Sequence, residues 1–169
     1  GSNGAVNHSA FLKNLENSGL RLQVIALCGH NRTAKSAIEK LSKRFRLLSV
    51  RALGQQNDMR SLMTVSDAIV ARPGTGTTSE SILAGCPIFF NTIGGIMPQE
   101  CITVRYMRVR GLEAPLIRRP SDLSAYLKPL IESKVYREQA RQKIDSLQPD
   151  IEPSQIVALL RELALSNGF

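Results

Sequence analysis

The chain has 169 residues, of which 43% are hydrophobic and 21% charged. This length and composition are typical of one globular domain and exclude a disordered chain. The 22 Lys and Arg exceed the 14 Asp and Glu, which gives a formal net charge of +8, and the excess lies in residues 1–50 and 101–169. The longest apolar runs, such as 24–28 and 86–90, have the length of strands and fall far short of the roughly 20 residues that span a bilayer.

The three cysteines, Cys28, Cys86 and Cys101, are odd in number and show no CxxC spacing. This usage argues against a disulfide framework or a zinc site and predicts buried thiols in a reducing compartment. Burial as small apolar residues is also the usual role of free cysteines. We therefore expect a cytoplasmic protein; the basic and apolar stretch described below suggests that it lies at the periphery of a membrane.

Apolar runs of strand length alternate with helix-like segments along the chain. The predicted strands are residues 22–28, 47–53, 67–71, 87–91 and 114–117. The predicted helices are residues 6–15, 34–44, a segment beginning near 58, then 77–84, 99–109, 123–131, 136–146 and 152–165. This alternation indicates βαβ units, so we predict an α/β fold with a Rossmann-like parallel sheet and helices on both faces. We expect a single domain, 1–169, in which 134–169 form a C-terminal helical extension.

The richest candidate site is the loop from Arg72 to Glu80, with the sequence Arg-Pro-Gly-Thr-Gly-Thr-Thr-Ser-Glu, which follows a predicted strand and opens a predicted helix. In parallel sheets the ligand lies at the carboxyl ends of the strands, and a glycine-rich helix N-terminus suits a phosphate or diphosphate. The loop lacks the spacing of a P-loop. The candidate phosphate-binding residues are Gly74, Thr75, Gly76 and Thr77. A structural alternative is a capping box, in which the side chains of Thr77 and Glu80 bind backbone N–H groups.

A second glycine loop, residues 93–98, leads to Gln99 and Glu100 at a predicted helix start. An amide and a carboxylate together donate to and accept from sugar hydroxyls, whereas the alternative is a favourable place for Glu in a first helical turn. His30 follows the first predicted strand. It is either a phosphate contact or acid–base group, or a turn residue.

Residues 1–5 form a third glycine loop, which enters a predicted helix with no strand before it. We interpret it as a strand-to-helix loop whose strand is cut away; a cloning remnant at Gly1-Ser2 is the alternative. The sequence has no Asp-x-Asp and no Gly-x-Ser-x-Gly frame. We therefore expect no divalent metal site, no cofactor and no serine hydrolase.

The order of these loops resembles that in the C-terminal, donor-binding halves of GT-B glycosyltransferases. The resemblance is to the group that contains monogalactosyldiacylglycerol synthases, diacylglycerol glucosyltransferases and the peptidoglycan N-acetylglucosaminyltransferase. It spans roughly residues 1–130 and rests on the Pro-Gly-Thr-x-Thr-x-x-Glu motif that ends at Glu80 and on the Gln99-Glu100 pair.

The resemblance implies inverting, metal-independent transfer of a hexose from a UDP-sugar to a lipid-type acceptor. It implies that the diphosphate is bound by Ser2, Asn3, Gly4 and the four loop residues from Gly74 to Thr77, the ribose by Glu80, the uracil by Leu53 and Gly54, and the hexose by Gln99 and Glu100. The family's catalytic base belongs to an N-terminal acceptor half, so the isolated chain is expected to be inactive. Arg72 and Pro98 depart from the residues usual in the family and leave the hexose open.

Basic residues mix with apolar ones near the end of the predicted helix 99–109. Arg105, Arg108 and Arg110, among Ile102, Val104, Tyr106 and Met107, predict contact with an anionic membrane surface, and a solvated helix face is the alternative. A UDP-sugar epimerase half is an alternative enzyme, although His30 and Glu100 supply only part of its acid–base groups. A non-catalytic nucleotide-sugar or nucleic-acid module is a third reading. Because aromatic residues are not interleaved with the basic runs, we expect no nucleic-acid partner.

Overall fold

The computed structural model describes residues 7–148 together with 154, 155, 157, 158, 161 and 162. The glycine loop of residues 1–5, with Ser2, Asn3 and Gly4, lies outside the described residues. Most of the predicted helix 152–165 also lies outside them, and its described residues are helical. No helix in the described part of the chain is long and apolar enough to cross a bilayer.

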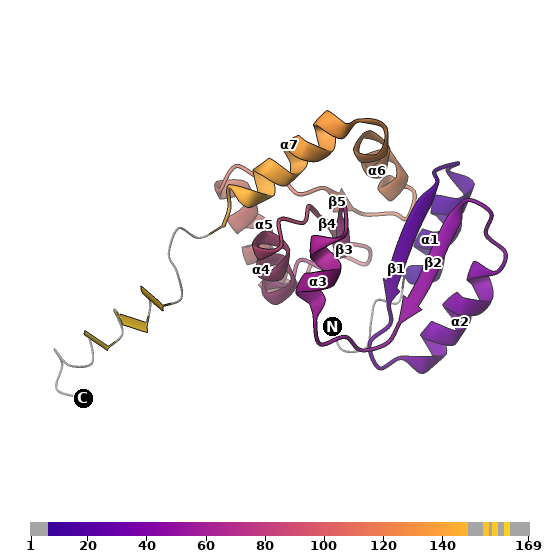
Figure 1. Cartoon of the computed structure of the whole chain (residues 1–169), viewed down its shortest axis with the longest axis horizontal. Helices are drawn as coiled ribbons and strands as arrows, with labels where there is room; N and C mark the ends of the chain where they lie inside the picture. Colours follow the sequence, from indigo (N-terminus) through magenta and orange to yellow (C-terminus); the bar gives the residue numbers. More distant parts are fainter. Residues whose placement is uncertain (1–6, 149–153, 156, 159–160, 163–169) are drawn as a thin grey trace.

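Helices and strands alternate along the chain, as predicted (Figure 1). The helices are α1 (His8–Asn17), α2 (Arg32–Ser42), α3 (Met59–Thr64), α4 (Thr75–Leu83), α5 (Pro98–Val109), α6 (Asp122–Glu132) and α7 (Lys134–Asp145). The strands are β1 (Leu22–Leu27), β2 (Leu48–Leu53), β3 (Ile69–Ala71), β4 (Ile88–Asn91) and β5 (Leu116–Ile117). Every strand lies inside its predicted run, because burial favours the apolar residues of each run.

All strand pairs are parallel, which confirms the predicted α/β fold. β1 pairs with β2 in a register that runs from Leu22↔Leu48 to Leu27↔Leu53. β4 lies between β3 and β5 in a second sheet, with Ile69 opposite Ile88. Among the described residues the strands therefore form two sheets, whereas the sequence suggested one. No strand ladder joins β1 to β3.

Two clusters of buried side chains hold the helices to the strands. The first joins Phe11, Leu12 and Leu15 of α1 to Ala26 of β1, Ile38 of α2, Leu48 of β2 and Phe89 of β4. The second joins Ile82, Ile88, Phe90, Met107, Ile144 and Leu147. Burial of each Leu, Ile, Phe or Met side chain in these clusters contributes about 1.5–3 kcal/mol. Because Ile144 and Leu147 follow residue 134, the described start of the predicted C-terminal extension packs on the same core.

Glu16 of α1 fixes this helix against the start of β2. Its carboxylate accepts hydrogen bonds from the backbone N–H groups of Arg46 at 2.7 Å, Leu47 at 3.2 Å and Leu48 at 3.1 Å. The hydrogen bond from Arg46 is the main cause of the lowered pKa of Glu16. The contact holds α1 on one face of the β1–β2 pair.

Candidate functional site

Two of the predicted loops leave neighbouring strands at the same edge of a sheet. β3 and β4 are parallel, with Ala71 opposite Phe90, so the chain leaves both at their carboxyl ends. The loop after β3 leads through Arg72 to α4, and the loop after β4 leads to α5. The structure therefore brings together the glycine loop before α4 and the loop that carries Gln99 and Glu100.

Among the residues that the structure describes, no side chain caps the N-terminus of α4. Gly74 is the N-cap residue, and its carbonyl accepts the N–H of Thr78 at 3.1 Å. Within the described structure, the backbone N–H groups of Thr75, Gly76 and Thr77 have no acceptor. Three parallel donors at the positive end of a helix form a surface suited to a phosphate group. Thr75 and Gly76 are exposed, so these donors are within reach of a ligand.

The alternative capping box at Thr77 and Glu80 is wrong. α4 begins at Thr75, two residues before the predicted start, which places Thr77 inside the first turn and Glu80 beyond it. The side chain of Glu80 is exposed and caps no N–H group in the described structure. Glu80 is therefore available for an external ligand.

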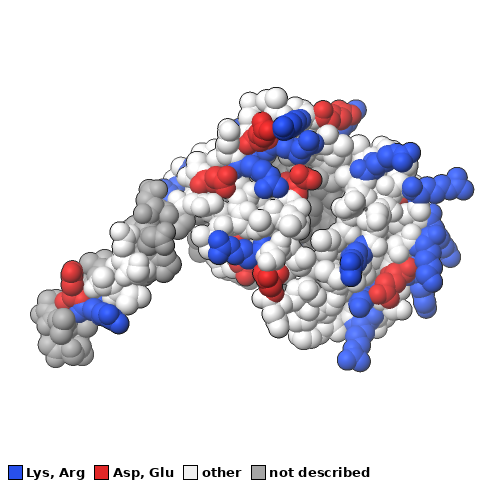
Figure 2. Space-filling view, in the orientation of Figure 1, with Lys and Arg blue, Asp and Glu red and all other residues white. Residues whose placement is uncertain are grey.

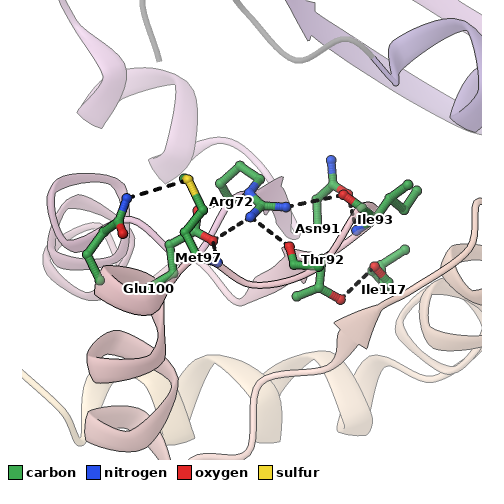
Figure 3. Close-up of polar contacts among 9 residues, drawn as sticks. Arg72, Asn91, Thr92, Ile93, Met97, Glu100 and Ile117 are labelled. Atoms are coloured by element: carbon green, nitrogen blue, oxygen red, sulfur yellow. Dashed lines mark hydrogen bonds and ion pairs between the residues drawn. The ribbon is translucent and has the colours of Figure 1, made fainter.

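Arg72 ties the end of β3 to the second glycine loop (Figure 3). Its Nε donates to Oε1 of Glu100 at 2.9 Å, and its Nη2 pairs with Oε2 of the same carboxylate. The guanidinium also donates to the carbonyls of Ile93 at 3.3 Å and Gly95 at 2.8 Å. Sequence reasoning named both charged residues but missed their ion pair, because they lie far apart along the chain.

Glu100 occupies the first turn of α5, as its structural alternative predicted. Oε2 also accepts the backbone N–H of Met97, the N-cap residue, at 2.9 Å. The side chain is only 4% exposed. Although burial alone would raise the pKa of Glu100, the hydrogen bonds from Arg72 and Met97 and the charge of Arg72 together lower it. The neighbouring Gln99 is exposed, with its amide 3.5 Å from the sulfur of Met97.

The residues predicted to contact uracil, Leu53 and Gly54, lie near the turn that holds His30, at the carboxyl ends of β1 and β2. Leu53 ends β2, and Gly54 lies so close to the β1 turn that a Cβ there would be 3.5 Å from the carbonyl oxygen of Gly29. His30 lies exposed in that turn, and the next residue, Asn31, caps α2 by accepting the N–H of Ala34 at 2.8 Å. The backbone around His30 is thus a turn, as its structural alternative predicted.

The cysteines differ from one another, which corrects the prediction that all three are buried. Cys28 and Cys86 are fully buried, and desolvation raises the pKa of both thiols, that of Cys86 to about 11. Cys101, one residue after Glu100, is exposed because it lies on the outer face of α5. In the part of the chain that the structure describes, no group of three or more His, Cys, Asp or Glu side chains could hold a metal ion.

Two other surface features lie apart from the candidate site. A cavity of about 770 Å³ lies beside β5 and is lined by residues that include Val104, Arg118 and Tyr126, but by none of the predicted donor-binding residues. Figure 2 shows Lys and Arg side chains along the edge of the molecule where Figure 1 places α2. An anion placed at the N-terminus of α4 would therefore be attracted mainly by backbone N–H groups.

No protein-family model matches the chain. Probable monogalactosyldiacylglycerol synthase 3 of Oryza sativa subsp. japonica is 31% identical over 85 residues, which cover 50% of this chain and 16% of the rice protein. Monogalactosyldiacylglycerol synthase 1 of Arabidopsis thaliana is 32% identical over 89 residues, which cover 53% of this chain and 16% of that protein. The matches thus cover about a sixth of the length of these curated relatives.

The crystal structure of MurG from Acinetobacter baumannii has a similar fold. It superposes with a TM-score of 0.75 at 20% identity, over 96% of this chain and 48% of the MurG chain. At this identity the likeness shows the fold alone, and it extends over about half of the larger protein. The chain therefore has the fold of one half of a GT-B glycosyltransferase and is similar in sequence to part of the monogalactosyldiacylglycerol synthases, which confirms the resemblance that its motifs predict.

Proposed function

We infer that the chain is the donor-binding half of an inverting, metal-independent glycosyltransferase that uses a UDP-sugar. The N-terminus of α4 carries this proposal, since three of its N–H groups have no acceptor in the described part of the chain and lie at the carboxyl edge of a parallel sheet. The similarity to monogalactosyldiacylglycerol synthases favours a glycosyltransferase over the epimerase and nucleic-acid alternatives.

The chemistry assigned to this half is stabilisation of the leaving group. An acceptor hydroxyl attacks the anomeric carbon on the face opposite the UDP, the bond to the diphosphate oxygen breaks, and negative charge develops on that oxygen. The N–H groups of Thr75, Gly76 and Thr77, with the positive end of α4, stabilise this charge without a metal ion. The base that removes the acceptor proton is assigned to another part of the enzyme, so this chain alone is expected to bind the donor without transferring it.

The remaining contacts to the UDP-sugar are assigned to predicted site residues according to how exposed their side chains are. Glu80 reaches the ribose hydroxyls from the exposed side of α4, and Leu53 and Gly54 meet the uracil, with His30 in the adjacent turn. Gln99 offers the direct contact to the hexose. The carboxylate of Glu100 is buried and already binds Arg72 and Met97, so it is assigned to holding the loop of residues 93–98 in place for the hexose.

Calorimetric titration of the chain with UDP, UDP-glucose, UDP-galactose and UDP-N-acetylglucosamine, without metal, tests the donor site. At least one of them is expected to bind, and the absence of binding by all four would overturn the proposal. Glu80→Ala is expected to weaken UDP binding at least about tenfold, because it removes charge-assisted hydrogen bonds, which are worth about 1.5–3 kcal/mol. Its melting temperature should change by less than about 2 °C, since the side chain caps nothing.

Glu138→Ala is the matched control for Glu80→Ala. Glu138 is also an exposed helical glutamate, but it lies on α7. UDP should bind to this variant as tightly as to the unmodified chain. Equal losses of affinity in the two variants would indicate a general charge effect and would contradict the role of Glu80.

Contact with a membrane surface is assigned to the outer face of α5, whereas binding of the lipid-type acceptor is assigned to the N-terminal acceptor half. Ile102, Tyr106 and Val109 lie on one side of this helix and are 69%, 44% and 77% exposed, whereas Met107 is buried. Arg105 lies beside them, and the guanidinium of Arg110 stands 5.7 Å from the centre of the Tyr106 ring. Apolar side chains flanked by arginines suit the headgroup region of an anionic bilayer.

Flotation with phosphatidylglycerol-containing liposomes tests this surface. The chain is expected to float with them at low salt and to be released as salt rises, because charge attraction near a bilayer falls within a Debye length. Replacing Ile102 and Val109 with serine should reduce flotation several-fold. The same substitution at Val135, which is exposed on α7, serves as the control. Liposome binding that does not change with salt concentration, or that the α5 substitutions do not reduce, would contradict the assignment.

A further inference from the structure

The excess positive charge of the chain is concentrated in the part that forms α1, α2, β1 and β2. Residues 7–54 contain nine Lys and Arg and two Glu, a formal charge of +7, against +8 for the whole chain. Figure 2 shows mostly Lys and Arg along the edge where Figure 1 places α2, whereas Lys and Arg mix with Asp and Glu over α6 and α7. Five of the nine lie on α2 or directly after it, namely Arg32, Lys35, Lys40, Lys43 and Arg44.

The two carboxylates of this part are already occupied. Glu16 binds the backbone N–H groups at the start of β2, and Glu39 pairs with the lysine one turn before it at 3.8 Å. Among the described residues, no Asp or Glu side chain forms an ion pair with Arg32, Lys40 or Arg44. By contrast, α5, α6 and α7 each carry a cation that pairs with a carboxylate nearby in the chain. The charge of α2 is therefore available to an external anion.

The placement of these cations does not serve the stability of α2. Arg32 is the first residue of the helix, and the first turn contains no acidic residue. The N-terminal end of a helix carries partial positive charge, so a cation there is unfavourable. The C-terminal end favours cations, but Lys40 is three residues from Lys43 and four from Arg44, so these like charges also repel one another. An anion bound to this face would relieve both repulsions.

A hollow of about 450 Å³ lies on the outer face of α2 between two of these cations. It is lined by Arg32 and Lys40 at its ends and by Thr33, Ser36 and Ala37 between them. The two ends are eight residues apart, which is about 12 Å along a helix. The small side chains let a ligand lie close to the helix, and the two hydroxyl groups offer hydrogen bonds to an oxygen ligand.

Charge and hydrogen bonding must hold this ligand, because the face is not apolar. The large apolar side chains that are exposed in the described structure include none from α1, α2 or β2. No aromatic side chain of residues 7–54 other than His30 is exposed, so this face lacks the stacking platforms that bind single-stranded nucleic acid. Figure 1 places α2 and α5 on opposite sides of the molecule, so a bilayer on the outer face of α5 lies away from α2. A protein segment rich in Asp and Glu matches the surface better.

We propose that the outer face of α2 is a docking surface for an acidic, extended segment of a partner protein. About four residues of an extended chain span the 12 Å between the ends of the hollow. Carboxylates of the segment pair with Arg32 and Lys40, and an oxygen between them accepts a hydrogen bond from Ser36. None of the residues that line the hollow is assigned to the UDP-sugar, so this inference goes beyond the proposed donor site and is independent of it.

Fluorescence anisotropy with a labelled decaglutamate peptide tests this surface on the full chain. The α2 variant replaces Arg32, Lys40 and Arg44 with glutamine. Its affinity for decaglutamate is expected to fall about tenfold at physiological ionic strength, because three exposed ion pairs are lost. Its melting temperature should stay within about 2 °C of that of the unmodified chain, since these side chains form no ion pair in the described structure. No binding of decaglutamate to the unmodified chain would overturn the proposal.

The matched control replaces Arg118, Lys128 and Lys143 with glutamine. All three side chains are exposed, and they lie after β5, on α6 and on α7. Both variants therefore lose three positive charges, but the control keeps those of α2. Its affinity for decaglutamate should fall less than about twofold, because charges farther away than a Debye length are largely screened. Equal losses in the two variants would show that net charge alone attracts the peptide, and would overturn the proposal.

Two further probes distinguish the acidic segment from other anionic partners. If a labelled thymidylate decamer bound more tightly than decaglutamate and lost this binding in the α2 variant, the face would belong to a nucleic acid. If the α2 variant no longer floated with phosphatidylglycerol liposomes, it would belong to a membrane. Either result would overturn the proposal. Weaker binding of decaglutamate with unchanged flotation would support it.

Discussion

Arg72→Ala is expected to lower the free energy of unfolding by about 2–4 kcal/mol, because it leaves the buried carboxylate of Glu100 without its partner. The Arg72 side chain is 34% exposed and that of Glu100 4%, so the expected loss is about 1 kcal/mol less than the roughly 3–5 kcal/mol of fully buried pairs. The variant also loses the guanidinium contacts to the carbonyls of Ile93 and Gly95. Urea-induced unfolding at pH 7 measures the difference.

Arg108→Ala is the control for this prediction. Arg108 pairs with Glu113 at 3.6 Å, but both side chains are largely exposed, so its removal should change stability by less than about 1 kcal/mol. If Arg72→Ala and Arg108→Ala lowered the free energy of unfolding by similar amounts, the ion pair of Arg72 with the buried Glu100 would not stabilise the fold more than an exposed pair does. Arg72→Lys should recover only part of the stability, because an ammonium group cannot make the two-pronged contact.

The effect of Arg72→Ala should depend on pH. In the intact chain the pKa of Glu100 lies below its ordinary value, so its stabilising contribution is present above that value and is lost as pH falls through the folded-state pKa. In the variant the buried carboxyl group is better accommodated when protonated. The difference in stability between the two proteins should therefore be greatest near neutral pH and shrink toward pH 3.

Gly76→Asp is expected to reduce affinity for UDP about 100-fold while it leaves the fold intact or more stable. A carboxylate at this position lies beside the three free N–H groups of α4 and repels a diphosphate by about 2–3 kcal/mol. For the folded chain the same substitution is favourable, since an acidic side chain at a helix start and the loss of a helical glycine each contribute about 0.3–1 kcal/mol. A Cβ at Gly76 meets no atom within 4 Å.

Gly76→Ala is the control that separates the effect of the added charge on UDP affinity from the effect of the added side-chain volume. It adds the Cβ without the carboxylate, so its UDP affinity should fall less than that of Gly76→Asp. Calorimetry gives the affinities, and thermal unfolding shows whether the fold survives. Unchanged UDP binding by Gly76→Asp, with a raised melting temperature, would mean that the α4 N-terminus does not bind the diphosphate.

Local sequence was enough to predict the elements, but not how the strands pair. Each strand follows from a short apolar run, and helix ends such as that before Gly19 follow from the positive φ of 80° that glycine accepts easily. The absence of a strand ladder between β1 and β3 could not be predicted from local sequence, because strand pairing depends on how distant segments of the chain come together. The predicted start of α4 was two residues too late, because its N-cap residue is a glycine and the nearby threonines have the side chains that usually cap helices.

The sequence predicted which loops form the candidate site, but it did not predict the contacts between those loops. Glycine loops after strands mark where a ligand can approach a backbone, and this signal is local. The ion pair of Arg72 and Glu100 forms only because β3 and β4 are neighbours, and nothing in either loop alone specifies that. An arginine and a glutamate that each follow strands predicted to be parallel neighbours are the one signal that could have suggested it.

The unequal burial of the cysteines gives the chain a natural labelling position. Thiol reagents attack the thiolate of an accessible cysteine, and burial keeps Cys28 and Cys86 protonated and out of reach. Cys101 is exposed beside Glu100, at the rim of the loop that Arg72 holds. A fluorophore or spin label attached there needs no engineered cysteine, and it would report on the loop of residues 93–98 while every other side chain stays native.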